Sequence, residues 1–152
     1  MQAALATRVR SLGLADYLPL VAEMRDFTLR RSTETPDEIW VLEHPPVYTL
    51  GQGADPRFGP KIASGVPVVQ AERGGEITYH GPGQAVLYTL VDIARRGIKV
   101  KEFLRLLEQC AIDPCGYPGL RVAQARDFGI EGSAREVGLR LARLVAEGLE
   151  HA

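Results

Sequence analysis

The chain has too few cysteines, too little positive charge and too few apolar runs for several classes of protein. Its 152 residues hold two cysteines, Cys110 and Cys115, which are too few for a disulfide scaffold and favour a reducing compartment. The formal net charge of −1 argues against nucleic-acid binding, because no basic excess is available to neutralise phosphates. No apolar stretch approaches the length of a membrane span, and no signal-peptide pattern opens the sequence. We therefore expect a cytoplasmic protein that binds neither nucleic acid nor membranes.

Patterns that bind nucleotides or metals are also missing. No Gly-Lys-Ser/Thr sequence closes a phosphate loop. His44, His80 and the two cysteines show none of the spacings that are typical of zinc sites. The sequence therefore predicts neither a cofactor nor a bound metal ion.

What is present is the patterning of an ordinary globular domain, with 45% hydrophobic and 24% charged residues. We expect a helix that begins near Asp16, strands at 38–43, 47–50, 66–70 and 85–91, a helix at 99–109 and a last helix capped by Ser133 and Glu136. Pro45 and Pro46 place His44 at a bend. This order favours one α+β domain over residues 1–152, with a mainly antiparallel sheet covered by helices.

The most unusual stretch is residues 73–84, with the sequence Arg-Gly-Gly-Glu-Ile-Thr-Tyr-His-Gly-Pro-Gly-Gln. It lies between two predicted strands, and glycine is typical of backbone that approaches a ligand closely. Arg73 supplies a rigid fork of donors, and His80 supplies a group that titrates near neutral pH. The stretch is either a ligand-binding loop or a glycine-rich hairpin with a surface arginine and a hydrogen-bonded histidine.

Cys115 is the best candidate for a nucleophile. It lies in a turn between Pro114 and Gly116, where a thiol can be displayed without a bulky neighbour. The reactive form is the thiolate, which requires a nearby cation, histidine or helix N-terminus to lower its pKa. The alternative is a buried and inert cysteine, which is common in proteins.

Together these residues resemble a known family. The Arg73–Gln84 block is similar to the signature of the octanoyl-[acyl carrier protein]:protein octanoyltransferases, the lipoate-protein ligase B family. Residues 37–49 and the Asp113-Pro114-Cys115-Gly116-Tyr117 segment resemble the family's first strands and its catalytic-cysteine loop. The resemblance implies a biotin/lipoate ligase-like fold with Cys115 as the catalytic residue. It also implies a substrate site made of Arg73, Gly74, Gly75, Glu76, Ile77, Thr78, Tyr79, His80 and His44.

The same resemblance implies an activity and its partners. Members of the family transfer an octanoyl group from octanoyl-acyl carrier protein to a lysine of lipoyl domains, through a thioester on the cysteine. The acceptors are the lipoyl domains of 2-oxoacid dehydrogenase complexes and the glycine cleavage H protein. No cofactor is implied.

The sequence departs from the family at one place. A family segment that carries the catalytic lysine is missing near residues 109–112, where Gln109 runs within a few residues into Asp113-Pro114-Cys115. Lys61 precedes the glycine-rich block, so we assign no catalytic lysine. Two alternatives remain open at this point. One is an ATP-dependent lipoate or biotin ligase, and the other is an inactive deletion variant that still binds acyl chains.

Overall fold

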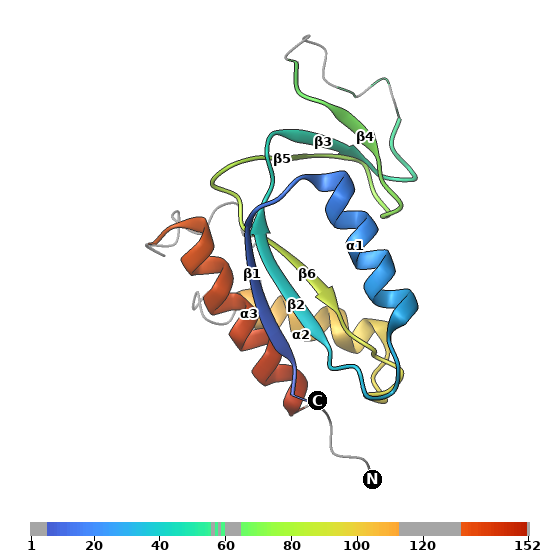
Figure 1. Ribbon diagram of the computed structural model, residues 1–152, viewed down its shortest axis with the longest axis vertical. Helices are drawn as coiled ribbons and strands as arrows, with labels where there is room; N and C mark the ends of the chain where they lie inside the picture. Colours follow the sequence, from blue (N-terminus) through green and yellow to red (C-terminus); the bar gives the residue numbers. More distant parts are fainter. Residues whose placement is uncertain (1–5, 56, 58, 60–64, 113–131, 152) are drawn as a thin grey trace.

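The structure is a computed structural model that describes residues 6–55, 57, 59, 65–112 and 132–151. Its strands are β1 Arg8–Leu14, β2 Glu38–Glu43, β3 Val47–Leu50, β4 Val68–Gln70, β5 Ile77–His80 and β6 Val86–Leu90, and its helices are α1 Tyr17–Arg30, α2 Val100–Ile112 and α3 Ala134–Glu150. Figure 1 shows a longer three-stranded sheet among the helices and a smaller one above the start of α1. None of the described helices combines the length and the apolar character that crossing a membrane requires.

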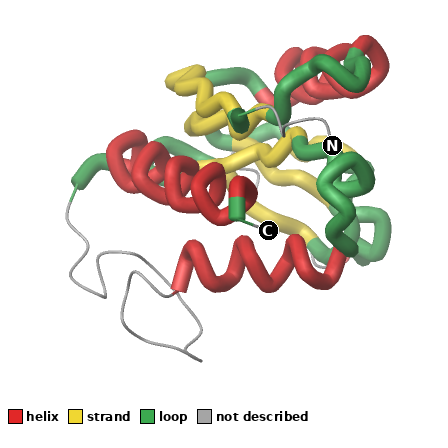
Figure 2. Tube along the Cα trace, turned by 90° about the horizontal axis from the view of Figure 1, so that it is seen from below, coloured by secondary structure: helices red, strands yellow, loops and turns green. Residues whose placement is uncertain are grey.

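The larger sheet has the order β1-β2-β6, with β2 parallel to β1 and antiparallel to β6. Helices lie on both sides of its strands (Figure 2), and this explains why the whole apolar stretch of β2 is buried. Alternate side chains of a strand point to opposite faces. Ile39 and Val41 pack against α3, whereas Trp40 and Leu42 pack against Leu20 of α1.

Helix α3 begins where the sequence predicts. The Ser133 hydroxyl accepts a hydrogen bond from the Glu136 backbone N–H, and the Glu136 carboxylate accepts one from the Ser133 N–H, so the predicted capping box is confirmed. Further along, α3 approaches β2 so closely that a Cβ at Gly138 would lie 2.7 Å from Cγ1 of Val41. A glycine is therefore needed at this crossing.

The smaller sheet has the order β4-β3-β5 and corrects one prediction. Residues 77–80 were expected to lie in a glycine-rich connection, but they form β5, which pairs antiparallel with β3. Val47 lies opposite His80, and Thr49 lies opposite Thr78. As a result, the predicted loop is split into a turn at 73–76, a strand, and a turn at 81–84.

Other differences from the sequence analysis are smaller. Strand β1 was not predicted, because its sequence Arg-Val-Arg-Ser-Leu-Gly-Leu has neither the β-branched content nor the strict alternation of a typical strand. Helix α2 runs to Ile112 and so continues through the 109–112 junction. The α+β class is confirmed, and each described sheet combines one parallel with one antiparallel pair.

A buried carboxylate fixes the start of β2. Asp37 is fully buried and accepts hydrogen bonds at 2.6 Å from each of Arg31, Arg95 and Arg96, together with one at 2.9 Å from the Asp92 N–H. Arg96 also donates to the Leu149 carbonyl at 2.6 Å. The cluster therefore ties the end of α1, the loop after β6 and the last turn of α3 to one point.

Candidate functional site

Two imidazoles face each other where the two sheets meet. His44 follows β2 at the predicted bend, and His80 ends β5. Their ring centroids are 5.7 Å apart, and the rings are nearly perpendicular. The Tyr17 ring, from the first turn of α1, stacks on His80 at 6.4 Å and meets the edge of His44 at 5.4 Å. Three elements distant in sequence thus build one aromatic cluster.

His44 is fully buried, and both of its ring nitrogens are engaged. Nδ1 lies 2.6 Å from the Ala15 carbonyl oxygen, so Nδ1 must carry the hydrogen and donate it. Nε2 lies 2.9 Å from the Tyr88 hydroxyl. Burial raises the pKa of Tyr88, so this hydroxyl stays protonated and donates to Nε2. The ring is held in one tautomer and has no nitrogen left for a ligand.

His80 is held in a similar way, although its surroundings are more open. The Gln84 side-chain nitrogen lies 3.4 Å from the Tyr79 carbonyl, which leaves the Gln84 oxygen to accept from Nδ1–H of His80 at 3.0 Å. Nε2 of His80 lies 3.3 Å from the Thr49 hydroxyl. Burial lowers the pKa of His80, and the nearby His44 and Arg73 lower it further, against an opposing effect of Gln84. The neutral imidazole is therefore the favoured form.

Arg73 is turned inward rather than toward an open site. Nη2 donates to the Thr49 carbonyl at 2.7 Å and to its hydroxyl at 2.8 Å, and Nε donates to the same hydroxyl at 3.2 Å. Nη1 donates to the Gly74 carbonyl at 2.9 Å. The guanidinium thus fastens the first glycine turn to β3.

The glycine turn packs backbone against backbone. The Gly51 N–H donates to the Glu76 carbonyl at 3.2 Å, and the Gln52 N–H donates to the Arg73 carbonyl at 2.9 Å. A Cβ added at Gly51 would overlap the Gly75 carbonyl oxygen and lie 2.7 Å from that of Gly74. Gly75 itself has φ +81°, which side-chain-bearing residues rarely adopt. These glycines are required by close approach and by backbone conformation.

Comparison with known proteins identifies the family. The model of the lipoyl protein ligase A/B catalytic domain matches residues 18–133, which is most of the chain. The chain belongs to the lipoyl protein ligase A/B catalytic domain family. It is 39% identical to the octanoyltransferase of Aromatoleum aromaticum, over 88% of this chain and 81% of that protein. It is 36% identical to the octanoyltransferase of Dechloromonas aromatica, over 93% of this chain and 96% of that protein. It is 50% identical to the octanoyltransferase of Methylococcus capsulatus, over 86% of this chain and 58% of that protein.

Two solved structures share the fold of this lipoyl protein ligase A/B domain. The putative lipoate protein ligase Ta0514 from T. acidophilum has a TM-score of 0.57 at 12% identity, over 85% of this chain and 55% of that one. Lipoate-protein ligase A bound with ATP has a TM-score of 0.55 at 14% identity, over 84% of this chain and 54% of that one. The chain spans about half the length of each, and the likeness concerns the fold alone.

The structure brings together some of the residues predicted for this family's substrate site. Thr78 and His80 alternate with Ile77 and Tyr79 along β5, so their side chains share one face of the strand. This face is the one toward the His44 cluster. Tyr79 lies on the other face, 45% exposed and against the Tyr48 ring at 5.2 Å. Cys115 lies outside the described residues, so its predicted role stays a prediction. Thr49, Tyr17 and Tyr88 were not predicted as site residues, since nothing local in the sequence marks them.

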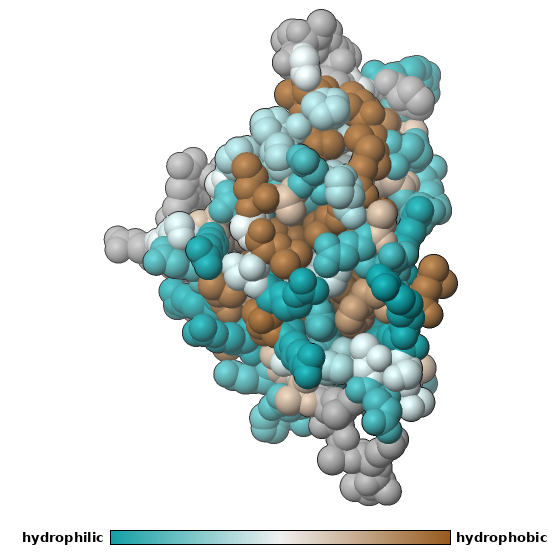
Figure 3. Space-filling view, viewed as in Figure 1, coloured by the Kyte–Doolittle hydropathy of each residue, from teal (hydrophilic) through white to brown (hydrophobic). Residues whose placement is uncertain are grey.

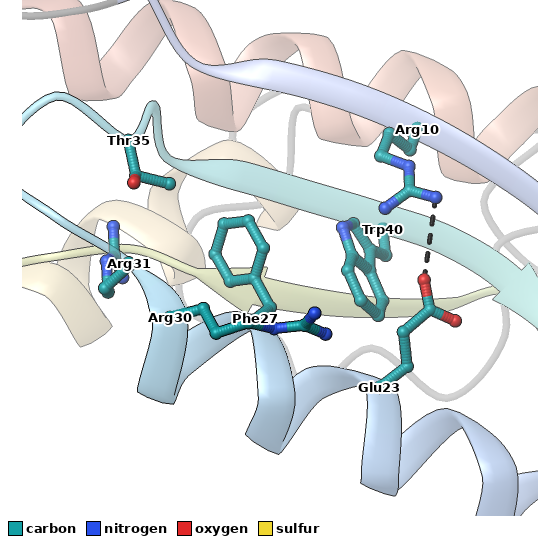
Figure 4. A pocket seen from close by; sticks show the side chains of 7 residues that line it. All are labelled: Arg10, Glu23, Phe27, Arg30, Arg31, Thr35 and Trp40. Carbon is teal, nitrogen blue, oxygen red and sulfur yellow. Dashed lines mark ion pairs between the residues drawn. The ribbon is translucent and has the colours of Figure 1, made fainter.

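Two hollows lie along α1 of this A/B domain, and only the first is lined by a residue of the aromatic cluster. One, of about 290 Å³, is lined by Tyr17, Val47, Val69 and four prolines among other residues, and Figure 3 shows apolar side chains gathered over the same upper part of the molecule. The other, of about 200 Å³, lies between α1 and β2, with Phe27 and Trp40 between arginines (Figure 4). Each arginine of the second hollow pairs with a carboxylate, namely that of Glu23, Asp26 or Asp37.

Replacing Gly51 with alanine is expected to displace the glycine turn and to destabilise the protein by about 1–3 kcal/mol, as overpacking of a tight contact does. Gly53→Ala is the matched control, because a Cβ there would meet only the Gly75 carbonyl oxygen, at 3.8 Å. Urea unfolding of both variants measures the difference. Equal stability of the two variants would contradict the close packing at Gly51.

Proposed function

We propose that this chain transfers an octanoyl group to a protein lysine. The observation that carries the proposal is its 36–39% identity to proteins named octanoyltransferase over 81–96% of their length. Membership of the lipoyl protein ligase A/B catalytic domain family supports the same conclusion. The donor is octanoyl-acyl carrier protein, the acceptors are lipoyl domains of 2-oxoacid dehydrogenase complexes and the glycine cleavage H protein, and the compartment is the cytoplasm.

The proposed reaction has two steps with Cys115 as nucleophile. The thiolate attacks the carbonyl carbon of the octanoyl thioester, and the carrier thiol leaves with a proton, so that an acyl-enzyme thioester remains. The acceptor amine then attacks this carbonyl, loses a proton and releases the Cys115 thiolate, which gives an amide. Because the lysine amine has a reference pKa of about 10.4, a general base must take up its proton.

The described residues supply binding surface rather than this base. His44 and His80 both have their ring nitrogens engaged by protein groups. The half-buried rings of His80 and Tyr17 form a surface that suits an alkyl chain, and the fully buried His44 supports them from behind. Burial of roughly six methylenes at about 0.8 kcal/mol each offers on the order of 5 kcal/mol before ordering costs. The resemblance places the base in the family segment that is missing near 109–112, so the second step is the part of the proposal that needs a direct test.

Intact-mass spectrometry tests the proposal. The full chain, mixed with octanoyl-acyl carrier protein and no ATP, is expected to gain the mass of one octanoyl group, and hydroxylamine is expected to remove it. A lipoyl domain added next should take up the group. If octanoyl transfer instead requires ATP and releases pyrophosphate, the chain is an ATP-dependent ligase and the thioester proposal is wrong.

A second candidate function is acyl binding without turnover. The alignments with the Aromatoleum and Dechloromonas proteins run over 189 and 198 residues, whereas this chain has 152. Those relatives therefore have residues without a counterpart here, which supports the prediction of a missing segment. If the segment holds the base, the adduct is expected to form on the chain, while transfer to the lipoyl domain fails.

A further inference from the structure

Thr49 lies at the centre of the polar contacts of the site. Its side chain is fully buried in the middle of β3. On one side it meets the guanidinium of Arg73, and on the other it meets the imidazole of His80. No other described side chain contacts both groups by hydrogen bonds. Thr49 therefore links the two groups.

The direction of the Thr49 hydroxyl follows from counting donors. Arg73 is always protonated and presents only N–H donors, two of which reach Oγ1, at 2.8 and 3.2 Å. These two bonds use both lone pairs of the oxygen. The hydroxyl hydrogen must then be donated, and Nε2 of His80 at 3.3 Å is nearer than the alternative, the Thr78 carbonyl at 3.5 Å.

The other nitrogen of His80 agrees with this direction. The Gln84 oxygen accepts at Nδ1, so the ring hydrogen sits there and Nε2 carries the free lone pair. The hydrogen-bonded series then runs in one sense, from Arg73 through Thr49 and His80 to Gln84. Protonation of His80 would place an N–H of Nε2 against a hydroxyl whose lone pairs are already occupied.

We propose that Thr49 is a positioning residue that holds His80 in its neutral Nδ1–H tautomer and keeps Arg73 against β3. For its catalytic meaning this inference rests on the proposed function, because a neutral ring can line an alkyl chain, whereas a charged ring would be poorly solvated beside it. The hydrogen-bond geometry on which it depends is independent of any activity.

The groups that face His80 all bear on its protonation. Arg73 adds positive charge from the glycine turn, His44 faces it from the end of β2, Tyr17 stacks on it from α1, and Gln84 accepts its hydrogen. Of the residues that touch Nε2, Thr49 alone supplies the donor in the described part of the chain. Removal of its hydroxyl therefore removes the donor at Nε2 of His80 together with two hydrogen bonds of Arg73, while the Arg73 bond to the Thr49 carbonyl stays possible.

Nuclear magnetic resonance of the full chain tests the proposal without substrate. Long-range ¹H–¹⁵N spectra of the unsubstituted protein are expected to show the His80 hydrogen on Nδ1. In Thr49→Val, which keeps the side-chain shape, the pKa of His80 is expected to rise by on the order of one unit. Thr49→Ser keeps the hydroxyl and is expected to restore the lower value.

Specific outcomes would overturn the proposal. A hydrogen on Nε2 of His80 in the unsubstituted protein would reverse the series, and an unchanged His80 pKa in a folded Thr49→Val protein would show that Thr49 serves packing alone. If Thr49→Val does not fold, the tautomer of the unsubstituted protein still decides. A failure of octanoyl transfer by the unsubstituted chain would reject the proposed function and leave these spectra unaffected.

Discussion

Replacing Cys115 with serine is expected to lower octanoyl transfer by roughly three orders of magnitude or more, because the acyl-enzyme can no longer form through a thiolate. A serine hydroxyl is far less ionised than a thiol near neutral pH, and the ring nitrogens of His44 and His80 are already engaged by protein groups. The initial rate of octanoyl transfer to a lipoyl domain measures the effect.

Cys110→Ser is the matched control for this experiment. The Cys110 thiol lies on α2 at 3.5 Å from the Leu144 carbonyl, where it packs between α2 and α3. This variant is expected to form the octanoyl adduct with the same stoichiometry as the unsubstituted chain. Loss of the adduct in Cys110→Ser together with its retention in Cys115→Ser would show that Cys110, and not Cys115, is the nucleophile.

Replacing Asp37 with asparagine is expected to destabilise the fold by roughly 3–5 kcal/mol, since it leaves Arg31, Arg95 and Arg96 around a neutral group. For a chain of this length the melting temperature is expected to fall by on the order of 10 °C. Asp26→Asn removes the carboxylate of an exposed pair with Arg30 and is expected to cost less than about 1 kcal/mol. Thermal unfolding of both variants makes the comparison, and equal melting temperatures would contradict a structural role of Asp37.

The same carboxylate predicts a dependence of stability on pH. Burial acts to raise the pKa of Asp37, but hydrogen bonds from the Asp92 N–H, Arg96 and Arg31 outweigh it and lower that pKa below its ordinary 3.8. A depressed folded-state pKa means that the stabilisation is complete above the unfolded-state value and is lost as pH falls through the folded-state value. The free energy of unfolding is expected to decline below about pH 4. In Asp37→Asn this decline should be smaller.

Local patterns predicted most of the elements. The capping box at Ser133 and the apolar spacing of residues 17–27 depend only on neighbours within a few positions, and both helices form as expected. Strand β5 was not predicted because glycines on both sides of residues 77–80 suggested a continuous loop. Its pairing with β3, in which Thr49 lies opposite Thr78, is a long-range contact that no local pattern carries.

The same limit applies to the site. The sequence drew attention to Arg73 and His80 as donor and titratable group, and both lie beside the His44 cluster. Their principal partner, Thr49, is 24 and 31 positions away, and the partner of His44, Tyr88, is 44 positions away. A threonine in a buried strand carries no local sign that it will meet an arginine. Residue types thus indicated the chemistry, while only the fold shows which groups are already engaged.

The position of α3 constrains the order in which the chain can mature during synthesis. Ile39 and Val41 of β2 are covered by α3. Arg96, one of the three arginines that bind Asp37, also binds the Leu149 carbonyl of α3. The face of β2 that carries Ile39 and Val41 therefore stays incompletely covered on the ribosome until α3 has emerged from the exit tunnel. During that interval the nascent chain presents the apolar face of β2 to chaperones.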